Sequence, residues 1–552
     1  MIETELCVYG ATSGGVAAAV QFHRLGRRAV LLAFDSHLGG LTSGGLGATD
    51  IGNKAAVGGI SREFYRRLGA YYSARKIAIP QRGQQKIEGG DAGKWDSGPT
   101  EAWVFEPSVA EGIMRELVSE AGVEVLYNQR LVGVQKSGNR IAQIVMEDGT
   151  IVRARMFIDA SYEGDLLAIA GVSYHVGREA NGVYDETLNG VHFGHPNHNF
   201  NRFVDPYVEA GRPGSGLLKG VFAGDGGRQG EGDHRIQAYN FRMCLTERAD
   251  IRVKFPRPAS YDAGRYELLR RYIAAGVHDA LNLTVNMPNG KTDTNNFGGF
   301  SSDNIGMNYG WADGLISATP SGVRVGGRTL AGEEPLSGVA LYELREQVFQ
   351  DHVAYQAGLY WFLGNDPRLP QGVRDDANRF GLAGDEFVES SHWPHQLYVR
   401  EARRMISEYV MTEHNCVGRF AIEDAVGMAA YTMDSHNCNR VVRAGRAINE
   451  EVGRFLPYPI SYRSIVPRES ECANLLVPVC LSSSHIAYGS IRMEPVFMIL
   501  GQSAATAAAL AIDGGSSVQG ISYAALQGQL RKDGQVLEWR EVPKFGTATL
   551  TA

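Results

Sequence analysis

This sequence of 552 residues has little cysteine, no long apolar run and no strong excess of one charge. Its six cysteines are scattered without a C-x-x-C pair, so they predict buried thiols in a reducing compartment rather than a disulfide framework. No apolar run reaches the length of a membrane span, and the first predicted strand begins too close to Met1 for a signal peptide. A net charge of −7 without a basic cluster argues against a nucleic-acid partner. We therefore expect a cytoplasmic protein with a large core.

Glycine, by contrast, is abundant, and its placement near the N-terminus is informative. An apolar strand over 6–9 stops at Gly10, an alanine-rich helix over 16–25 ends at Gly26, and a second apolar strand follows at 28–34. The strand-to-helix turn of such a βαβ unit points backbone N–H groups and the positive helix end at a phosphate. This context predicts a dinucleotide site; the alternative is a packing unit without a ligand. The residues predicted to line the pyrophosphate are Gly10, Thr12, Ser13, Gly14 and Gly15.

Two positions depart from the usual G-x-G-x-x-G pattern. Thr12 stands at the middle glycine, where a branched side chain narrows the approach of the pyrophosphate unless its hydroxyl donates to it. Phe34 stands where an acidic residue is expected at the end of the second strand, and Asp35 comes next. We therefore predict that Asp35 binds the ribose hydroxyls.

Further elements follow from the residue patterns. These patterns predict helices over 61–68 and 107–121, a strand over 123–127, three meander strands over 131–135, 141–146 and 151–156, and a strand over 156–160 that returns to the parallel sheet. Hairpin turns at 138–139 and 148–149 join the meander strands. The polar, glycine-rich residues 80–103 predict a loop.

The βαβ rhythm is absent from about 172 to 460, a region rich in Gly, Asn, Asp, Tyr and Trp. It returns with a strand over 472–480, a loop over 481–495 and an alanine-rich helix over 496–512. We therefore predict an α/β fold: a Rossmann-like parallel sheet with a β-meander, plus a large inserted α+β substrate domain. The predicted boundaries are 1–171 for the first part of the cofactor domain, 172–460 for the substrate domain, and 461–552 for the return and a C-terminal tail.

Five segments together resemble a known family: residues 9–15, 37–40, 157–166, 484–495 and 501–508. They look like the FAD-dependent oxidoreductase family of glutathione-reductase-like flavoproteins, which is often labelled putative xanthan lyase. The matching segments run from the first strand to the last helix. The resemblance implies an FAD-binding domain and redox chemistry, and it names no substrate.

The resemblance also implies roles for individual residues. It implies that the flavin or its ribityl chain is approached by Gly39, Gly40, Thr42 and Ser43. It implies that the turn beside the adenosine half is closed by Asp159, Ala160 and Ser161. It places in the region beside the isoalloxazine Gly501 and Gln502.

The polar residues before the last helix are the candidates for catalysis. A flavoenzyme that oxidises an alcohol needs a base, and His485 is our first candidate, with Tyr488 close by; a histidine bonded to backbone is the alternative. Arg492 either stabilises the anionic reduced flavin or pairs with Glu494. His436, in a short polar patch, is the rival base.

Three other motifs invite a function. Arg400, Arg403 and Arg404 are predicted on adjoining helix faces, as a clamp for a carboxylate or polyol or as a solvated charged face. His192, His195 and His198 lack Cys or Asp partners at ligand spacing and are interrupted by Gly194 and Pro196, so we predict no metal site. His37 is either a point of covalent flavin attachment or an ordinary loop histidine.

The leading hypothesis is an FAD-dependent oxidoreductase that oxidises a polar hydroxylated small molecule, of sugar, glycoside or polyol type, by hydride transfer to flavin. The alternatives are C–C desaturation or reduction of a carboxylate substrate, a polysaccharide lyase, and a binding protein whose FAD is structural. No second glycine-rich βαβ unit for NAD(P) is visible, so the electrons are expected to leave to oxygen, a quinone or a protein. A homo-oligomer is left open.

Overall fold

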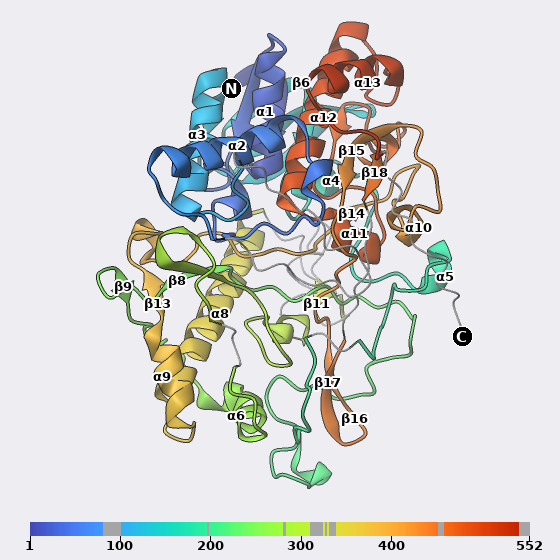
Figure 1. Cartoon of the computed structure of the whole chain (residues 1–552). Helices are drawn as coiled ribbons and strands as arrows, with labels where there is room; N and C mark the ends of the chain where they lie inside the picture. The colour runs from blue at the N-terminus through green and yellow to red at the C-terminus, as the bar shows by residue number, and fades with distance from the viewer. Residues whose placement is uncertain are drawn as a thin grey trace.

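A seven-stranded sheet joins the N-terminal and C-terminal parts of the chain (Figure 1). The computed structural model describes residues 1–80, 101–195, 198–279, 283–309, 324–325, 328–329, 338–450 and 457–539. The strands of the sheet are β1 (Ile2–Tyr9), β2 (Ala29–Leu32), β3 (Glu124–Leu126), β4 (Leu131–Ser137), β5 (Arg140–Met146), β6 (Ile151–Asp159) and β19 (Leu475–Leu476). Most of the loop predicted at 80–103 lies outside the described residues.

The sheet combines a parallel part and an antiparallel meander. Its order is β3-β2-β1-β6-β5-β4, and β19 pairs with β6. The first half of β6 pairs antiparallel with β5, and its second half pairs parallel with β19, while β1 runs parallel along its other side. The strands predicted at 151–156 and 156–160 are therefore one strand, long enough to serve both parts. The prediction of a Rossmann-like parallel sheet with a meander is confirmed.

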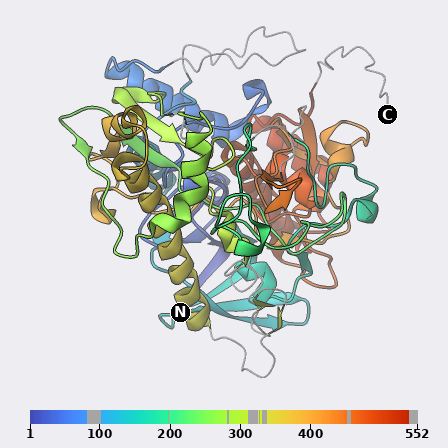
Figure 2. The same cartoon turned by 90° about the horizontal axis from the view of Figure 1, so that it is seen from below.

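Five helices contribute buried side chains to the same hydrophobic cluster as this sheet: α1 (Ser13–Arg24), α2 (Gly59–Ala74), α3 (Pro107–Ala121), α12 (Glu494–Gly514) and α13 (Tyr523–Lys532). Helices α1 and α12 come from opposite ends of the chain and lie side by side (Figures 1 and 2). A Cβ atom at Gly501 would lie 2.0 Å from the carbonyl oxygen of Gly14, so only glycine permits this crossing. Helix α12 is long and apolar enough to span a membrane, but 94% of its apolar window is buried inside the protein, as in a core helix.

A second hydrophobic cluster lies between residues 200 and 447, separate from the cluster around the sheet. Its antiparallel sheet has the order β10-β8-β13-β9. The elements of this part are β8 (Met243–Thr246), β9 (Arg252–Val253), β10 (Lys291–Thr294), β13 (Gly381–Ala383), α6 (Glu267–Ala274), α8 (Gly338–Asn365) and α9 (Gln371–Arg379). In Figure 1 the labelled ones among them (β8, β9, β13, α6, α8 and α9) lie in the lower left part of the molecule.

The remaining elements are short. The strand pairs are β7 (Tyr174–His175) with β14 (Arg404–Met405), β11 (Arg324–Val325) with β12 (Arg328–Thr329), β15 (Ala425–Ala429) with β18 (Tyr458–Ser461), and β16 (Arg440–Arg443) with β17 (Arg446–Asn449); the short helices are α4 (Asp165–Ile169), α5 (Asn181–Tyr184), α10 (Glu413–Cys416) and α11 (His485–Ile491). Side chains of β15 and β18 belong to the cluster around the first sheet. The boundaries at 171 and 460 therefore stay a prediction, because residues before 460 contribute to that core.

Two local predictions near the C-terminus were wrong. The strand expected over 472–480 is reduced to the two residues of β19, although its apolar side chains are buried. The loop expected over 481–495 contains α11, whose first turn is capped by the Ser484 side chain. Sequence periodicity does not reveal α11, because all seven of its residues are buried and no polar face marks it.

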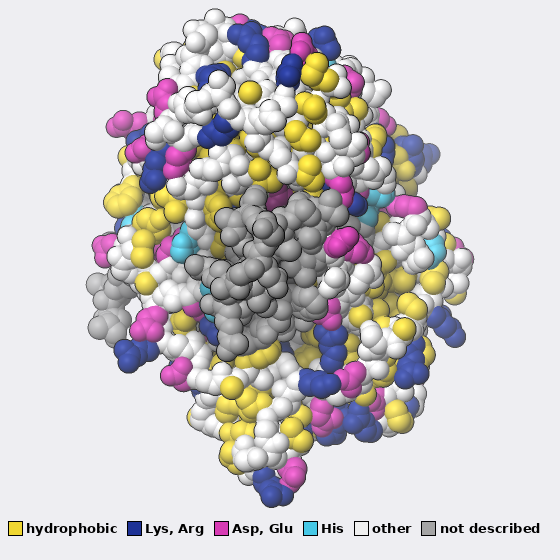
Figure 3. All heavy atoms as spheres, turned by 180° about the vertical axis from the view of Figure 1, so that it is seen from behind, with side chains coloured by type: hydrophobic (Ala, Val, Ile, Leu, Met, Phe, Trp, Pro, Cys, Tyr) yellow, Lys and Arg dark blue, Asp and Glu magenta, His cyan; other side chains and the backbone are white. Residues whose placement is uncertain are grey.

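The surface and the cysteines agree with the composition. All six cysteines are free and buried, as predicted. On the face shown in Figure 3, Lys and Arg side chains are interspersed with Asp and Glu over the described part of the surface. Among the described side chains of that face, the two signs of charge are mixed.

Candidate functional site: two glycine loops and a buried polar cluster

The two glycine-rich loops lie side by side at the carboxyl end of β1. Thr12 and Gly39 form a parallel bridge, and the Gly39 N–H donates to the Ala11 carbonyl at 2.8 Å. Gly10 and Gly39 adopt left-handed φ angles of 99° and 102°, which other residues rarely adopt. Ligands of open parallel sheets bind at the carboxyl ends of the strands, and both loops lie at this edge.

Close packing makes the first loop dependent on glycine. A Cβ atom at Gly15 would lie 1.9 Å from the Gly10 carbonyl oxygen. At Gly10 it would lie 2.6 Å from the Ser161 nitrogen, on the turn that follows β6. The first helical turn is thus fixed against two neighbouring strand ends.

Thr12 caps helix α1 and does not offer its hydroxyl hydrogen to a ligand. Its Oγ1 donates to the Ala160 carbonyl at 2.8 Å and accepts from the Gly15 N–H at 3.3 Å. The Val16 N–H bonds to the Thr12 carbonyl. Of the first four N–H groups of the helix, those of Ser13 and Gly14 remain for an anion. The expected contact between the Thr12 hydroxyl and a pyrophosphate is therefore replaced by this cap.

A buried carboxyl group, Glu494, links the loops. Its Oε2 accepts from the Ser13 hydroxyl at 2.6 Å and from the Thr42 hydroxyl at 2.8 Å. Its Oε1 accepts from the Tyr162 hydroxyl at 2.7 Å, which in turn accepts from the Leu41 N–H at 2.8 Å. Burial raises the pKa of Glu494 above its usual range, and the three hydroxyls offset only part of this effect. Four separate segments therefore meet at one side chain.

The turn after β6 is held by its own side chains. Asp159 accepts from the Ser161 hydroxyl at 2.6 Å and from the Leu167 N–H at 2.8 Å. Burial raises the pKa of Asp159 to about 6 despite these bonds. The Ala160 carbonyl accepts a hydrogen bond from the Thr12 hydroxyl, so Asp159, Ala160 and Ser161 together close this turn. The position of this turn beside the adenosine half of FAD stays a prediction.

The other predicted cofactor residues differ in their contacts. Asp35 lies at the carboxyl end of β2 and accepts from the His37 N–H at 2.8 Å, and Ser43 bonds to carbonyls of its own loop. Gly501 lies against Gly14 at the helix crossing. Gln502 accepts from the Ile60 N–H at 2.8 Å, so it contacts α2 rather than the glycine loops.

Buried side chains of alternating charge form a continuous series of ion pairs, which we call the polar line. Arg400 pairs with Asp303 at 2.8 Å, and the other oxygen of Asp303 lies 3.1 Å from His436 Nδ1. His436 Nε2 lies 3.0 Å from Asp434, which pairs with Arg492 at 3.5 Å. Both ring nitrogens of His436 thus face carboxylates, and neither is directed toward a substrate proton. This arrangement speaks against His436 as the base.

Two arginines of this line retain unused donors. The guanidinium groups of Arg400 and Arg492 lie 4.5 Å and 5.6 Å from the centre of the Tyr398 ring, and Arg492 donates to the Tyr398 hydroxyl at 2.6 Å. Their Nε atoms are buried and have no hydrogen-bond partner among the described residues. A buried donor without a partner costs about 1–3 kcal/mol, which a ligand oxygen would remove.

His485 occupies the centre of a second buried array. Its Nδ1 lies 2.8 Å from Glu401, and its Nε2 lies 2.9 Å from the Ser435 hydroxyl. Burial by itself raises the pKa of Glu401, but its interactions with His485 and Arg404 outweigh this effect and hold the pKa below its usual range. With hydrogen on Nδ1, the Nε2 lone pair faces Ser435 and can accept a proton. The backbone-bonded alternative for the His485 ring does not apply.

Tyr488 lies in the same helix and is buried. Burial, followed by the charges of Cys480 and Glu401, raises its pKa well above the usual range. The phenol therefore stays protonated and does not act as a base at neutral pH.

The predicted solvated arginine face was wrong. Residues 398–403 form no helix, and Arg400, Arg403 and Arg404 are at most 1% exposed. Arg403 pairs with Asp165 at 3.0 Å, and Arg404 pairs with Glu179 at 2.7 Å. A buried guanidinium requires such partners, which come from distant parts of the chain.

Three residues connect the polar line to the glycine loops. Arg492 ends α11 and contacts Asp434, not Glu494. Two residues later, Glu494 begins α12 and contacts Ser13 and Thr42. The segment between α11 and α12 therefore brings the polar line and the glycine loops next to each other.

A family model described as "FAD dependent oxidoreductase" matches residues 5–530. The chain belongs to this family. FAD is its cofactor, and it is an enzyme. The comparison with curated proteins finds no match.

Solved structures similar to parts of this family member include other flavoenzymes. OxyS anhydrotetracycline hydroxylase from Streptomyces rimosus is 15% identical over 36% of this chain and 41% of its own, with a TM-score of 0.26. A flavin-containing monooxygenase from Stenotrophomonas maltophilia is 17% identical over 35% and 45%, with a TM-score of 0.19. The match thus spans less than half of either structure's length.

The glycine loops fit FAD. Ser13 and Gly14 offer N–H groups at the positive end of α1, as a pyrophosphate requires. A Cβ atom at Gly10, Gly15, Gly39 or Gly40 would meet other protein atoms at 3 Å or less, so these glycines let the two loops pack closely at the end of β1. We expect these residues to hold the cofactor of the family.

The Glu494→Gln variant tests the buried carboxyl group. A raised folded-state pKa means that the folded protein keeps its proton above about pH 4.3, where the unfolded chain loses it. The wild-type protein is therefore expected to lose stability relative to the variant as the pH rises through this window. Thermal unfolding of both FAD-loaded proteins as a function of pH measures the difference. The Glu3→Gln variant, at an exposed carboxyl, is the control, and a pH-independent difference for Glu494→Gln would contradict the assignment.

The sequence alone did not identify several residues of the site. Glu494 and Tyr162 lie inside family-like segments, and a glutamate before Pro495 at a helix start was an available signal. Ser435 adjoins His436, but nothing pointed to its hydroxyl. Asp303 and Glu401 carried no local signal, because their partners are distant in sequence.

Proposed function

We propose that this enzyme oxidises a hydroxyl-bearing carbon of a neutral, polar small molecule of sugar, glycoside or polyol type. The observation that carries the proposal is the hydrogen-bonded array of Ser435, His485 and Glu401, which is built to accept a proton. Oxidation of an alcohol to a carbonyl releases a hydride and a proton. FAD, when bound, supplies the acceptor for the hydride.

The residues of the chain supply the proton acceptor and the orientation. His485 Nε2 takes up the hydroxyl proton, directly or through the Ser435 hydroxyl, while Glu401 fixes the tautomer and stabilises the charge that forms. The Nε atoms of Arg400 and Arg492 offer hydrogen bonds to substrate oxygens.

Charge pairing favours a neutral substrate over a carboxylate. Arg400 is paired with Asp303, Arg492 with Asp434, and Arg404 with Glu179. A substrate carboxylate would have to compete with these carboxylates, whereas a hydroxyl group uses the remaining donors. The desaturation alternative therefore has less support, and the lyase alternative makes no use of the FAD-binding loops.

Anaerobic reduction of the bound flavin tests this proposal. We expect sugars, glycosides or polyols to bleach the flavin absorption band, and hydroxy acids of similar size to do so more slowly. Reoxidation by oxygen, quinones and an electron-transfer protein then identifies the acceptor, which stays a prediction. A flavin that only carboxylates reduce would contradict the assignment.

A further inference from the structure

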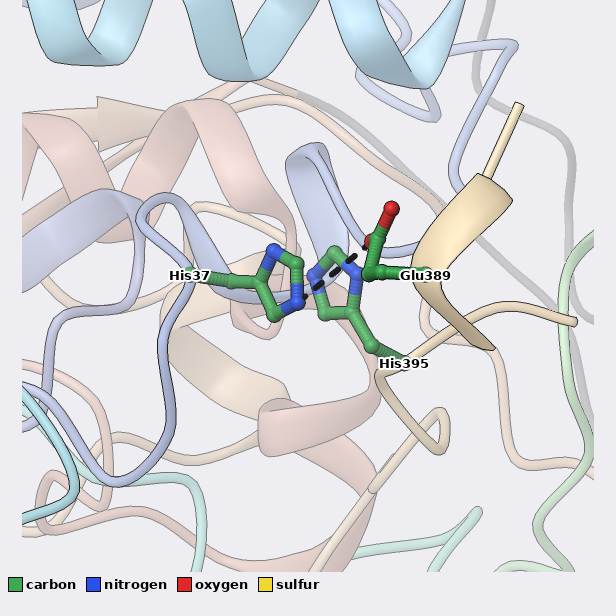
Figure 4. Close-up of side chains that lie close together, drawn as sticks. All are labelled: His37, Glu389 and His395. Atoms are coloured by element: carbon green, nitrogen blue, oxygen red, sulfur yellow. Dashed lines mark ion pairs between the residues drawn. The ribbon is translucent and has the colours of Figure 1, made fainter. Parts of the chain in front are cut away.

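Two histidines and a glutamate from distant parts of the sequence meet beside the second glycine loop (Figure 4). His37 precedes Gly39, while Glu389 and His395 belong to the segment before the buried arginines. One ligand atom of each of the three side chains lies within 4.8 Å of the other two. His37 Nε2 lies 3.6 Å from Glu389 Oε1, and the two imidazole rings stack with their centres 3.7 Å apart.

The partners of these rings point to a missing ligand. Both ring nitrogens of His395 are buried and lack a hydrogen-bond partner among the described residues. His37 Nδ1 lies 3.2 Å from Glu111 Oε2, which leaves Nε2 directed toward the cluster. A carboxylate on the far nitrogen of a histidine is the usual outer partner of a metal-bound imidazole.

The backbone around Glu389 is strained. Phe387, Ser391 and His392 have left-handed φ angles of 50°, 57° and 67°. Non-glycine residues adopt this conformation at a cost, and such residues gather at functional sites. Here the strained turn holds Glu389 toward the two histidines.

We propose that His37, Glu389 and His395 bind a divalent transition-metal ion, with zinc the first candidate. Two imidazoles and one carboxylate form a common ligand set for zinc, in which water completes the coordination. The carboxylate of Glu389 is exposed, so water can reach the ion. This site is separate from His192, His195 and His198.

Metal binding closes the cluster. Bonds of about 2.0–2.1 Å in a tetrahedral zinc site place ligand atoms about 3.3 Å apart. The side chains must therefore rotate inward, and the stacked rings must open toward the ion. A Cβ atom at Gly44 would lie 3.1 Å from His395 Nε2, so the cluster borders the second glycine loop. The ion ties this loop to the segment that carries Glu389.

The experiment uses the FAD-loaded protein without an affinity tag, treated with a chelator and then titrated with zinc chloride by calorimetry. We expect one zinc ion per chain for the wild type and the His192→Ala control. The His395→Ala and Glu389→Gln variants are expected to lose this binding. The Glu111→Gln variant is expected to bind about 10- to 100-fold more weakly.

Flavin content and circular dichroism establish that each variant is folded. Glu389 is exposed, so Glu389→Gln keeps the test valid if His395→Ala does not fold. A wild-type protein that binds no zinc, or folded His395→Ala and Glu389→Gln variants that bind it as tightly as the wild type, would overturn the proposal.

Discussion

The Gly15→Leu variant is expected to lose its FAD completely. A single Cβ atom at this position would already lie 1.9 Å from the Gly10 carbonyl oxygen, so the turn and α1 cannot keep their places. Without them, the N–H groups of Ser13 and Gly14 no longer converge on the pyrophosphate. The flavin absorption of the purified protein, before and after incubation with FAD, measures the loss.

The Gly112→Leu variant is the matched control for this substitution. Gly112 also lies in a helix, α3, but no atom comes within 4 Å of a Cβ built there. We expect this variant to keep its FAD. Normal flavin content in Gly15→Leu would mean that the pyrophosphate lies elsewhere.

The His485→Ala variant is expected to keep its flavin spectrum and to reduce its flavin about 10²- to 10⁴-fold more slowly with a substrate identified in the anaerobic assay. This range is the typical contribution of a general base. In the mechanism that we propose, His485 Nε2 holds the lone pair that accepts the hydroxyl proton. Stopped-flow absorption under anaerobic conditions measures the rate.

The His436→Ala variant tests the rival base in the same assay. His436 lies between Asp303 and Asp434, the carboxylates that pair with Arg400 and Arg492. Because we propose that these arginines bind substrate oxygens, removal of His436 should weaken substrate binding more than it slows reduction at saturation. A large loss of rate in His436→Ala with a near-normal His485→Ala would reverse the assignment. Normal rates in both variants would exclude histidine base catalysis.

The sequence determined the cofactor-binding frame because its signals are local. The strand, the glycine turn and the helix over 6–26 follow from apolar runs that end at glycines, and the structure has β1 and α1 there. The meander followed from alternating residues and turn pairs, and helix α3 from Pro107 at its start and Gly122 after its end. Each of these features depends on neighbours a few residues away.

The tertiary structure decided the chemistry of the polar side chains. The Thr12 hydroxyl hydrogen bonds to Ala160 because the turn after β6 lies opposite it. Arg400, Arg403 and Arg404 are buried because carboxylates far away in sequence pair with them. The same holds for His485, which Glu401 and Ser435 reach from two other segments. Local patterns fix which elements form, whereas burial and pairing of charges depend on which elements the fold brings together.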